Sequence, residues 1–450
     1  MSTLGDLTVP KIDQSGPPKA GEFTYIDISS IDNKLKRIVE PKHLPARIAP
    51  SRAKQRLQPG DVLVSMTRPN LNAVAIVSPD LEGAVGFTGF HVLRAVDGIE
   101  SRWLFYAVQT HDFVEAMSSL VQGALYPAVR PKDIRAFGIE APPLDEQRLI
   151  VAEIEKQFSR LDEAVASLKR VKANLKRYKA AVLKAAVEGK LTEDWRKAHP
   201  DVEPASKLLE RILSERREKW NGRGKYKEPI TLDTNDLPSL PKAWTWATVE
   251  QLASGCSGAI QSGPFGSQLL HSEFVDDGIL AIGIDNVLDG KFSVGRQHRI
   301  TPAKFKALEK FAARSRDVVI TVMATVGRVC VLPQRLEPAI ITKHCYRITP
   351  APGNVDSEFL AAALRADGVT RQHIFGSVRG QTRPGINGPI LKVAPVSLAP
   401  FDEQKEIVAE VERRLSVIDE LEAAVEANLI RADRLRQSIL RQAFSGALVC

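Results

Sequence analysis

The chain has 450 residues, of which 44% are hydrophobic and 26% are charged. That length suggests about three domains, and this much apolar material excludes a wholly disordered chain. No run of about 18 uncharged apolar residues is present, and the first residues lack a basic and apolar leader pattern, so neither a membrane span nor a signal peptide is expected. The four cysteines form no CxxC pair, which disfavours a zinc site and fits a reducing cytoplasm. The net charge of +8 favours a polyanionic partner.

The strongest feature of the sequence is an internal repeat. Residues 145–191 match residues 402–448 at an offset of 257, with 17 identities in 47 ungapped positions, whereas chance would give about three. Weaker matches continue upstream at offsets of 254–257; Gly60-Asp-Val-Leu-Val-Ser65, for example, resembles Arg316-Asp-Val-Val-Ile-Thr321. We therefore expect a tandem duplication, in which a diverged globular part precedes a better-kept helical part.

Both copies of the helical part show a seven-residue hydrophobic period. Heptads sustained over this length are typical of coiled-coil helices. Asp145 and Asp402 stand at the expected N-caps, and Gly189 and Gly446 at the expected ends. The apolar residues at this period are Ile154, Leu161, Leu168, Leu175 and Val182 in the first copy, and Val411, Ile418, Val425, Ala432 and Ile439 in the second.

The charges on the two helices favour antiparallel pairing. Residues 145–168 carry six acids and three bases, whereas residues 169–190 carry one acid and eight bases. Residues 402–426 carry nine acids and three bases, whereas residues 427–448 carry one acid and four bases. An antiparallel pair sets each acidic half against a basic half. The alternative is that the charges on each helix only complement its own dipole. That effect fades beyond the terminal turns, whereas the charge bias here fills whole halves.

The remaining segments give the domain plan. Residues 1–143 and 241–399 contain short β-branched runs between Gly, Pro and Asp breaks, with one helical run each, which indicates mixed α/β domains. Residues 144–191 and 400–450 are the two helices, and residues 192–240 form a linker with a surface helix. The expected fold is thus two α+β domains separated by two long helices that pair as an antiparallel coiled coil, with a pseudo-two-fold axis.

The sequence offers no catalytic chemistry. It contains no GxxxxGK[ST] phosphate loop, no HExxH pair, no GxSxG elbow and no adenine-methyltransferase signature. Loops in the globular parts instead mix Arg, Lys, Asn, Gln and aromatic residues, which contact phosphates and base edges in DNA. Such residues on loops are also often merely solvated. The DNA-binding candidates are Arg68, Asn70, Asn72, Tyr126, Arg130 and Lys132 in the first part, and Gln261, Ser262, Phe265, Lys343, Arg379, Gln381 and Arg383 in the second.

The order of these segments resembles a known family. Pro-Leu-Asp-Glu-Gln at 143–147, Gly-Lys-Leu-Thr-Glu-Asp-Trp-Arg at 189–196 and Leu-Pro-Lys-Ala-Trp-Thr-Trp at 240–246 are similar to motifs of the specificity subunits of type I restriction–modification enzymes. The resemblance covers essentially the whole chain. One departure is that the Trp-containing opening of the second domain has no counterpart in the first, whose N-terminal edge is therefore expected to be short.

The resemblance implies a subunit without catalytic activity. Each domain, called a target-recognition domain, would read one half of a split DNA sequence, and the helices would set the distance between the halves. The subunit would recruit two modification subunits and two restriction subunits, so S-adenosylmethionine, ATP and Mg²⁺ are expected on those partners and no cofactor or metal on this chain. The acid-rich helix starts, which would repel phosphate, are assigned to subunit contact: Asp145, Glu146, Gln147, Asp402, Glu403 and Gln404.

Two other functions stay open. A coiled-coil scaffold with two protein-binding domains would have the same helices but would bind no DNA. A self-contained methyltransferase or nuclease would need the catalytic motifs that are missing. A steep loss of DNA affinity with salt would distinguish a DNA reader from a scaffold.

Overall fold

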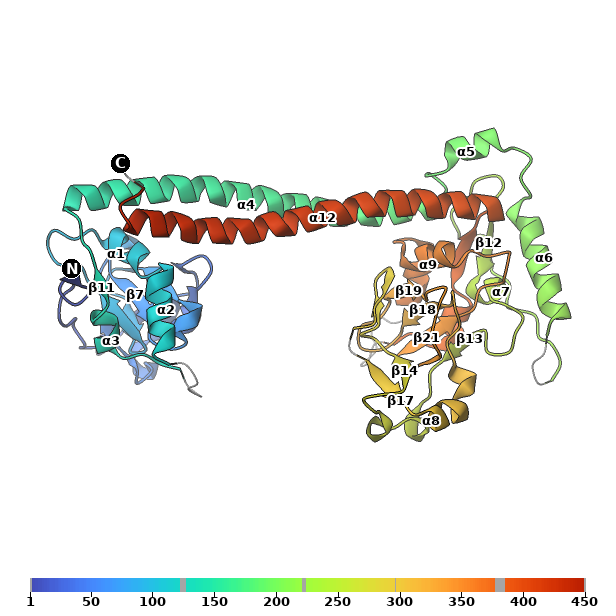
Figure 1. Ribbon diagram of the computed structural model, residues 1–450, viewed down its shortest axis with the longest axis horizontal. Helices are drawn as coiled ribbons and strands as arrows, with labels where there is room; N and C mark the ends of the chain where they lie inside the picture. The colour runs from blue at the N-terminus through green and yellow to red at the C-terminus, as the bar shows by residue number, and fades with distance from the viewer. Residues whose placement is uncertain (1, 122–126, 221–223, 296, 377–384, 449–450) are drawn as a thin grey trace. The chain divides into compact units, whose positions relative to one another are not determined.

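The computed structural model describes residues 2–121, 127–220, 224–295, 297–376 and 385–448 (Figure 1). The chain divides into two compact units. Unit 1 comprises residues 1–171 and 424–450, and unit 2 comprises residues 172–423. Each unit contains one globular domain and a segment of both long helices, so each is described by itself.

The domain of unit 1 is built on two small sheets. One has the order β10-β7-β8, with β7 at Val62–Ser65, β8 at Val74–Ile76 and β10 at Phe90–Leu93. The other has the order β5-β2-β9-β6, with β2 at Glu22–Ile26, β5 at Lys42–Pro45, β6 at Ala53–Arg56 and β9 at Val85–Phe87. Two short pairs complete it: β1 (Ser2–Thr3) with β11 (Gly138–Ile139), and β3 (Ile31–Asp32) with β4 (Arg37–Ile38). Its helices are α1 (Ser101–Ala107), α2 (His111–Ser119) and α3 (Pro131–Arg135).

The domain of unit 2 repeats this plan, with one more edge strand in the first sheet and one fewer in the second. The order β13-β21-β18-β19 joins Ile260–Ser262, Cys345–Ile348, Val318–Thr321 and Val329–Val331, and the order β17-β14-β20 joins His298–Ile300, Ile279–Ile282 and Ala339–Ile341. The short pairs are β12 (Thr245–Thr248) with β22 (Pro395–Leu398), and β15 (Val287–Leu288) with β16 (Lys291–Phe292). The helices are α5 (Glu193–Ala198), α6 (Ala205–Glu218), α7 (Val249–Leu252), α8 (Pro302–Ala307), α9 (Ser357–Arg365), α10 (Val369–Gly376) and α11 (Gly388–Lys392).

The register of the central hairpins shows that the two domains are copies. In unit 1, Ser65 of β7 pairs with Phe90 of β10. In unit 2, Thr321 of β18 pairs with Cys345 of β21 in the same register position. The second sheets also agree, because β2 lies between an antiparallel and a parallel neighbour, as β14 does. The duplication read from the sequence is therefore present in the fold.

The two long helices, α4 (Leu144–Val187) and α12 (Phe401–Phe444), run antiparallel in both units. In unit 1, Asp162 of α4 pairs with Arg436 of α12. In unit 2, Lys179 of α4 pairs with Asp419 of α12 at 2.9 Å. Later positions on one helix thus meet earlier positions on the other, and the two ion pairs are related by the 257-residue offset. The expected fold, two mixed domains with an antiparallel helix pair, is confirmed.

The ends of the helices differ in part from the sequence-based expectation. Gly189 and Gly446 follow the last turns in the left-handed conformation, with φ of +70° and +76°, which suits a C-terminal glycine. Asp145 and Asp402 are not N-caps, because both helices begin one residue earlier. They lie in the first turn, where a carboxylate still favours the helix dipole.

The predicted linker helix is α6, and it is an integral part of unit 2. Its apolar side, made of Ala205, Leu208 and Ile212, is buried. Near its end, Nη1 of Arg216 donates to the carbonyl oxygens of Glu250 at 2.6 Å and Ala253 at 2.8 Å. These bonds satisfy carbonyls at the end of α7, so the linker helix is held against the domain that follows it.

Candidate nucleic-acid interface

Three segments meet at one end of the central hairpin in unit 1. The amide of Met66, directly after β7, donates to Gly89 O at 2.9 Å, and the amide of Val129 donates to Met66 O at 2.9 Å. The amide of Arg68 donates to Pro127 O at 2.8 Å. These bonds bring the loop 66–72 beside the segment 127–132. Two groups of candidate residues far apart in the sequence therefore lie together.

Two of these bonds have counterparts in unit 2. The amide of Val322, directly after β18, donates to His344 O at 2.8 Å, and the amide of Ile386 donates to Val322 O at 3.1 Å. The amide of Gly263 donates to Cys345 O at 3.3 Å, so the turn after β13 joins the group. A Cβ added to Gly263 would lie 2.2 Å from the Thr342 carbonyl carbon, so this close approach requires glycine. We call the end of each hairpin where these segments meet the loop face.

The described candidates of unit 1 differ in the exposure and hydrogen bonding of their side chains. Arg68 and Asn70 are exposed. Asn72 is partly enclosed, because its Nδ2 donates to Val108 O at 3.2 Å. Arg130 is exposed but pairs with Asp133 at 3.1 Å, and this contact raises the pKa of the guanidinium and lowers that of the carboxyl. Lys132 is exposed.

The described candidates of unit 2 lie on neighbouring segments of its loop face. Gln261 and Ser262 belong to β13, and the side-chain Nε2 of Gln261 donates to Ser262 O at 2.9 Å. Phe265 has 46% of its surface exposed, which is unusual for so large an apolar side chain. Lys343 is exposed in the turn before β21. Tyr126, Arg379, Gln381 and Arg383 lie outside the described residues.

One segment of the unit 2 loop face was missed in the sequence. The loop Val322–Arg328 occupies the place that Met66–Asn72 has in unit 1, but before its last residue, Arg328, it contains only Val, Met, Ala, Thr and Gly. A search for basic and amide side chains passes over it. The matched strands that precede the two loops could have identified it, since the offset there is 256.

The residues predicted for subunit contact at the starts of α4 and α12 are partly buried and partly exposed. Gln147 and Gln404 are 1% and 0% exposed. The Oε1 of Gln147 accepts from the Glu100 amide at 2.8 Å, and the Oε1 of Gln404 accepts from the Asp356 amide at 2.9 Å. The Nε2 atoms donate to equivalent carbonyls, namely Pro142 at 2.7 Å and Gly98 at 3.4 Å in unit 1, and Ala399 at 3.0 Å and Asn354 at 3.4 Å in unit 2. Each glutamine therefore fastens a long helix to its domain.

Glu403 is also enclosed, although its counterpart Glu146 is exposed. Its carboxylate accepts from Thr192 Oγ1 at 2.6 Å and Trp244 Nε1 at 2.9 Å, and it pairs with Arg196. Gln147, Glu403 and Gln404 thus present no free side chain to a partner and serve the fold. The exposed residues of the group, which remain available for subunit contact, are Asp145, Glu146 and Asp402.

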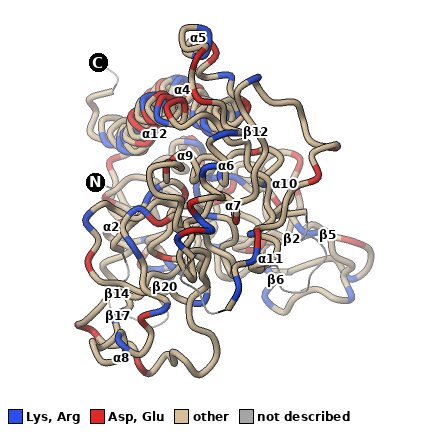
Figure 2. The backbone as a smooth tube through the Cα atoms, turned by 90° about the vertical axis from the view of Figure 1, so that its right-hand side faces the viewer, with Lys and Arg blue, Asp and Glu red and all other residues tan. Residues whose placement is uncertain are grey.

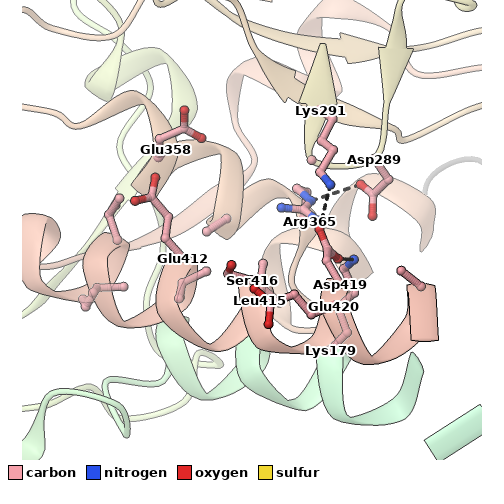
Figure 3. Close-up of a pocket in the computed structure, with 16 residues that line it drawn as sticks. Lys179, Asp289, Lys291, Glu358, Arg365, Glu412, Leu415, Ser416, Asp419 and Glu420 are labelled. Carbon is pink, nitrogen blue, oxygen red and sulfur yellow. Dashed lines mark hydrogen bonds and ion pairs between the residues drawn. The ribbon is translucent and has the colours of Figure 1, made fainter. Parts of the chain in front are cut away.

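A cavity of about 590 Å³ lies in unit 2 where the domain meets α12 (Figure 3). Asp419 accepts from Lys179 of α4 at 2.9 Å and from Lys291 of β16 at 2.6 Å, so one carboxylate joins three elements. These two lysines hold the pKa of Asp419 below its usual value against the opposing effect of burial. Arg365 of α9 pairs with Asp289 at 3.1 Å on the same hairpin. The ion pairs around the cavity therefore hold the domain of unit 2 against α12.

Neither helix carries one sign of charge throughout. Figure 2, which looks nearly along the helix axes, shows both Lys or Arg and Asp or Glu positions on α4 and α12. Among the described residues, no group of three His, Cys, Asp or Glu side chains could hold a metal ion. No described helix is long and apolar enough to cross a membrane.

Comparisons with known proteins agree with the duplicated fold. Residues 291–430 match the family model described as type I restriction modification DNA specificity domain. The chain is 26% identical over 398 residues to the type I restriction enzyme EcoKI specificity subunit of Escherichia coli K12, which covers 88% of this chain and 76% of that one. It is 24% identical over 356 residues to the EcoBI specificity subunit of Escherichia coli, covering 78% of this chain and 66% of that one. The chain is therefore similar to type I specificity subunits over most of its length.

Solved structures support the fold of this chain. The HsdS subunit from Thermoanaerobacter tengcongensis superposes with a TM-score of 0.53 at 24% identity, covering 99% of this chain and 96% of that one. A chain from a study of complex assembly and conformational transition of the type I R-M system superposes with a TM-score of 0.72 at 24% identity, covering 99% and 97%. Both chains are matched over nearly their whole length.

Proposed function

We propose that this specificity subunit reads a bipartite DNA site, with one domain for each half-site and no catalytic residue of its own. The observation that carries the proposal is the repeated loop face. Two of its backbone hydrogen bonds, those made by Met66 and by Val322, recur in both units, whereas the exposed side chains on it differ. A common frame with different side chains suits two domains that bind the same polymer at different sequences.

The candidate contacts fall into two classes. Arg68, Arg130, Lys132 and Lys343 are cations that can bind phosphate or guanine, whereas Asn70, Gln261 and Ser262 can hydrogen-bond to base edges. Phe265 can contact a base or sugar through its exposed ring. Asn72 is the weakest candidate, because its amide is already bonded to Val108 O. Tyr126, Arg379, Gln381 and Arg383 remain proposals from the sequence alone.

The helices are proposed to set the gap between half-sites. A helix of 44 residues, the length of α4 and of α12, rises about 66 Å at about 1.5 Å per residue. One heptad inserted in each helix keeps the buried seam in place and adds about 10 Å, or about 3 base pairs. The methylated site should then keep both half-sequences, and the gap between them should become about 3 base pairs longer.

The partners follow from the family. We propose that the subunit docks two modification subunits and two restriction subunits in the cytoplasm, with S-adenosylmethionine, ATP and Mg²⁺ on those partners. Asp145, Glu146 and Asp402 are the exposed residues proposed for these contacts. Co-purification of the wild-type chain with a modification subunit, compared with a triple Asp145→Asn, Glu146→Gln and Asp402→Asn variant, tests the assignment. Unchanged assembly of the variant would remove these residues from the interface.

DNA binding tests the function itself. The purified chain with its modification subunit should bind a cognate duplex, and the logarithm of the affinity should fall linearly with the logarithm of the salt concentration, because bound phosphates release counterions. Binding of proteins alone, with no DNA affinity to lose, would identify a scaffold instead. Methylation without a bipartite pattern would contradict the reading of two half-sites.

A further inference from the structure

Two equivalent residues on the loop faces have left-handed backbone conformations. Arg68 has φ of +49° and ψ of +61°, and Ala324 has φ of +61°. Each lies three residues after the last residue of its central strand, Ser65 of β7 or Thr321 of β18. Residues with a side chain rarely adopt this conformation. The two positions thus share a backbone conformation and a distance from the preceding strand, although the loop in unit 2 is one residue shorter and the side chains differ.

The surrounding bonds hold each residue in this conformation. The Arg68 amide donates to Pro127 O at 2.8 Å, and its carbonyl accepts from the Leu71 amide at 2.9 Å. The loop of Ala324 is closed by the Gly327 amide, which donates to Thr321 O at 2.8 Å. Strain that is held in this way by its surroundings is typical of functional loops.

The exposed chemistry at this position differs between the domains. Arg68 is exposed, and its guanidinium makes no hydrogen bond or ion pair with the described residues. Ala324 is exposed as well, and it follows Met323, which is 36% exposed. One loop therefore presents a planar group of hydrogen-bond donors, and the other presents only apolar atoms. Arginine matches the two acceptors of guanine in the major groove, whereas alanine and other apolar groups match the methyl group of thymine.

We infer that position 68 of the first domain and position 324 of the second are corresponding base-reading positions, with Arg68 contacting a guanine and Ala324, together with Met323, contacting a thymine methyl group. This inference rests on the proposed DNA-reading function. It adds the base class that each loop recognises. The chemistry at one backbone position thereby distinguishes the two half-sites.

The direct test removes the thymine methyl group without changing any hydrogen-bonding atom. The assembled complex with its modification subunits is titrated with cognate duplexes in which each thymine of the second domain's half-site is replaced in turn by uracil. One replacement should weaken binding about fourfold, the effect of losing one buried methyl group. In the first domain's half-site, replacement of one guanine should weaken binding of the wild type but not of Arg68→Ala.

The matching variant is Ala324→Arg, which introduces the side chain that the equivalent backbone of Arg68 already accommodates. It should shift the preferred base in the second half-site from thymine to guanine by about tenfold or more. The control is Arg316→Gly. Arg316 also has positive φ, at +63°, but it precedes β18 instead of following it, and its counterpart is Gly60 with φ of +86°. This variant should keep the wild-type base preference.

The outcomes separate the inference from the function on which it rests. If the wild-type complex shows no bipartite preference, the proposed function fails. If the wild type reads a bipartite site but no uracil replacement weakens binding, or if Ala324→Arg keeps the wild-type motif while assembling normally, the inference is wrong. A second half-site without any thymine would also overturn it.

Discussion

The enclosed carboxylate of Glu403 allows a sharp test of what the helix start does. Glu403→Ala leaves Thr192, Trp244 and Arg196 without their shared acceptor. Because Glu403 is 0% exposed, removal of this charge leaves a poorly solvated partner, and such a loss costs about 3–5 kcal/mol. For a unit of this size each kcal/mol lowers Tm by about 2–4 °C, so the transition of unit 2 should fall by roughly 6–20 °C.

The repeat supplies the control for this prediction. Glu146 is the same residue at the same helix position in unit 1, but it is exposed. Glu146→Ala should change the free energy of unfolding by less than about 0.5 kcal/mol. Differential scanning calorimetry of the isolated full-length chain measures both variants without any partner subunit. Equal and small shifts in Tm would show that Glu403 is not held as described and would return it to the list of subunit contacts.

The remaining predictions concern the glutamines, a buried lysine and the salt response. Gln147→Ala and Gln404→Ala should each lower the free energy of unfolding of their own unit by about 1–3 kcal/mol, because buried backbone groups lose their partners. Amide hydrogen exchange should therefore become faster in the unit that carries the substitution, and faster exchange in the other unit alone would contradict this. Burial and the nearby Arg436 lower the pKa of Lys36 from 10.5 to about 8. The unfolded chain therefore binds one more proton between these values, and the stability of unit 1 should rise from pH 8 to pH 10.5. Thermal unfolding of Lys36→Met should lack that rise, and an identical pH profile would refute it. Arg68→Ala should alter base preference in the first half-site with little change in the logarithmic salt slope of DNA binding, because the contact is to a guanine; a slope shallower by about 1 with unchanged base preference would show a phosphate contact instead.

Periodic features of the fold were predictable from the sequence. The heptads and the opposed charge halves gave the helix pair and its direction, which Asp162–Arg436 and Lys179–Asp419 confirm. Such patterns can be read from the sequence because they depend on residues close together along one helix, or on a partner helix with the same seven-residue period. The similarity to type I specificity subunits was also predictable from the order of the segments, since that order is kept where the side chains diverge.

Features that depend on distant partners were not predictable. Asp-Glu-Gln is identical at 145–147 and 402–404, yet of the two glutamates only Glu403 is buried. It is enclosed by Arg196 and Trp244, which lie 207 and 159 residues away along the chain. The loop Val322–Arg328 has no basic or amide side chain before Arg328 that would mark it as part of a binding surface. The matched strands indicate its position along the chain, but its place beside His344 and Ile386 depends on hydrogen bonds to distant segments.

The most direct test of the account is a domain exchange read by methylation. The wild-type chain, and a chain whose residues 241–399 are replaced by the second target-recognition domain of another type I specificity subunit, are expressed with modification subunits. Adenine methylation is then mapped across the genome by single-molecule sequencing. We predict one bipartite motif for the wild type, and for the exchanged chain a motif in which one half changes while the other half and the gap are retained. A change in both halves, or methylation without a split motif, would contradict the account.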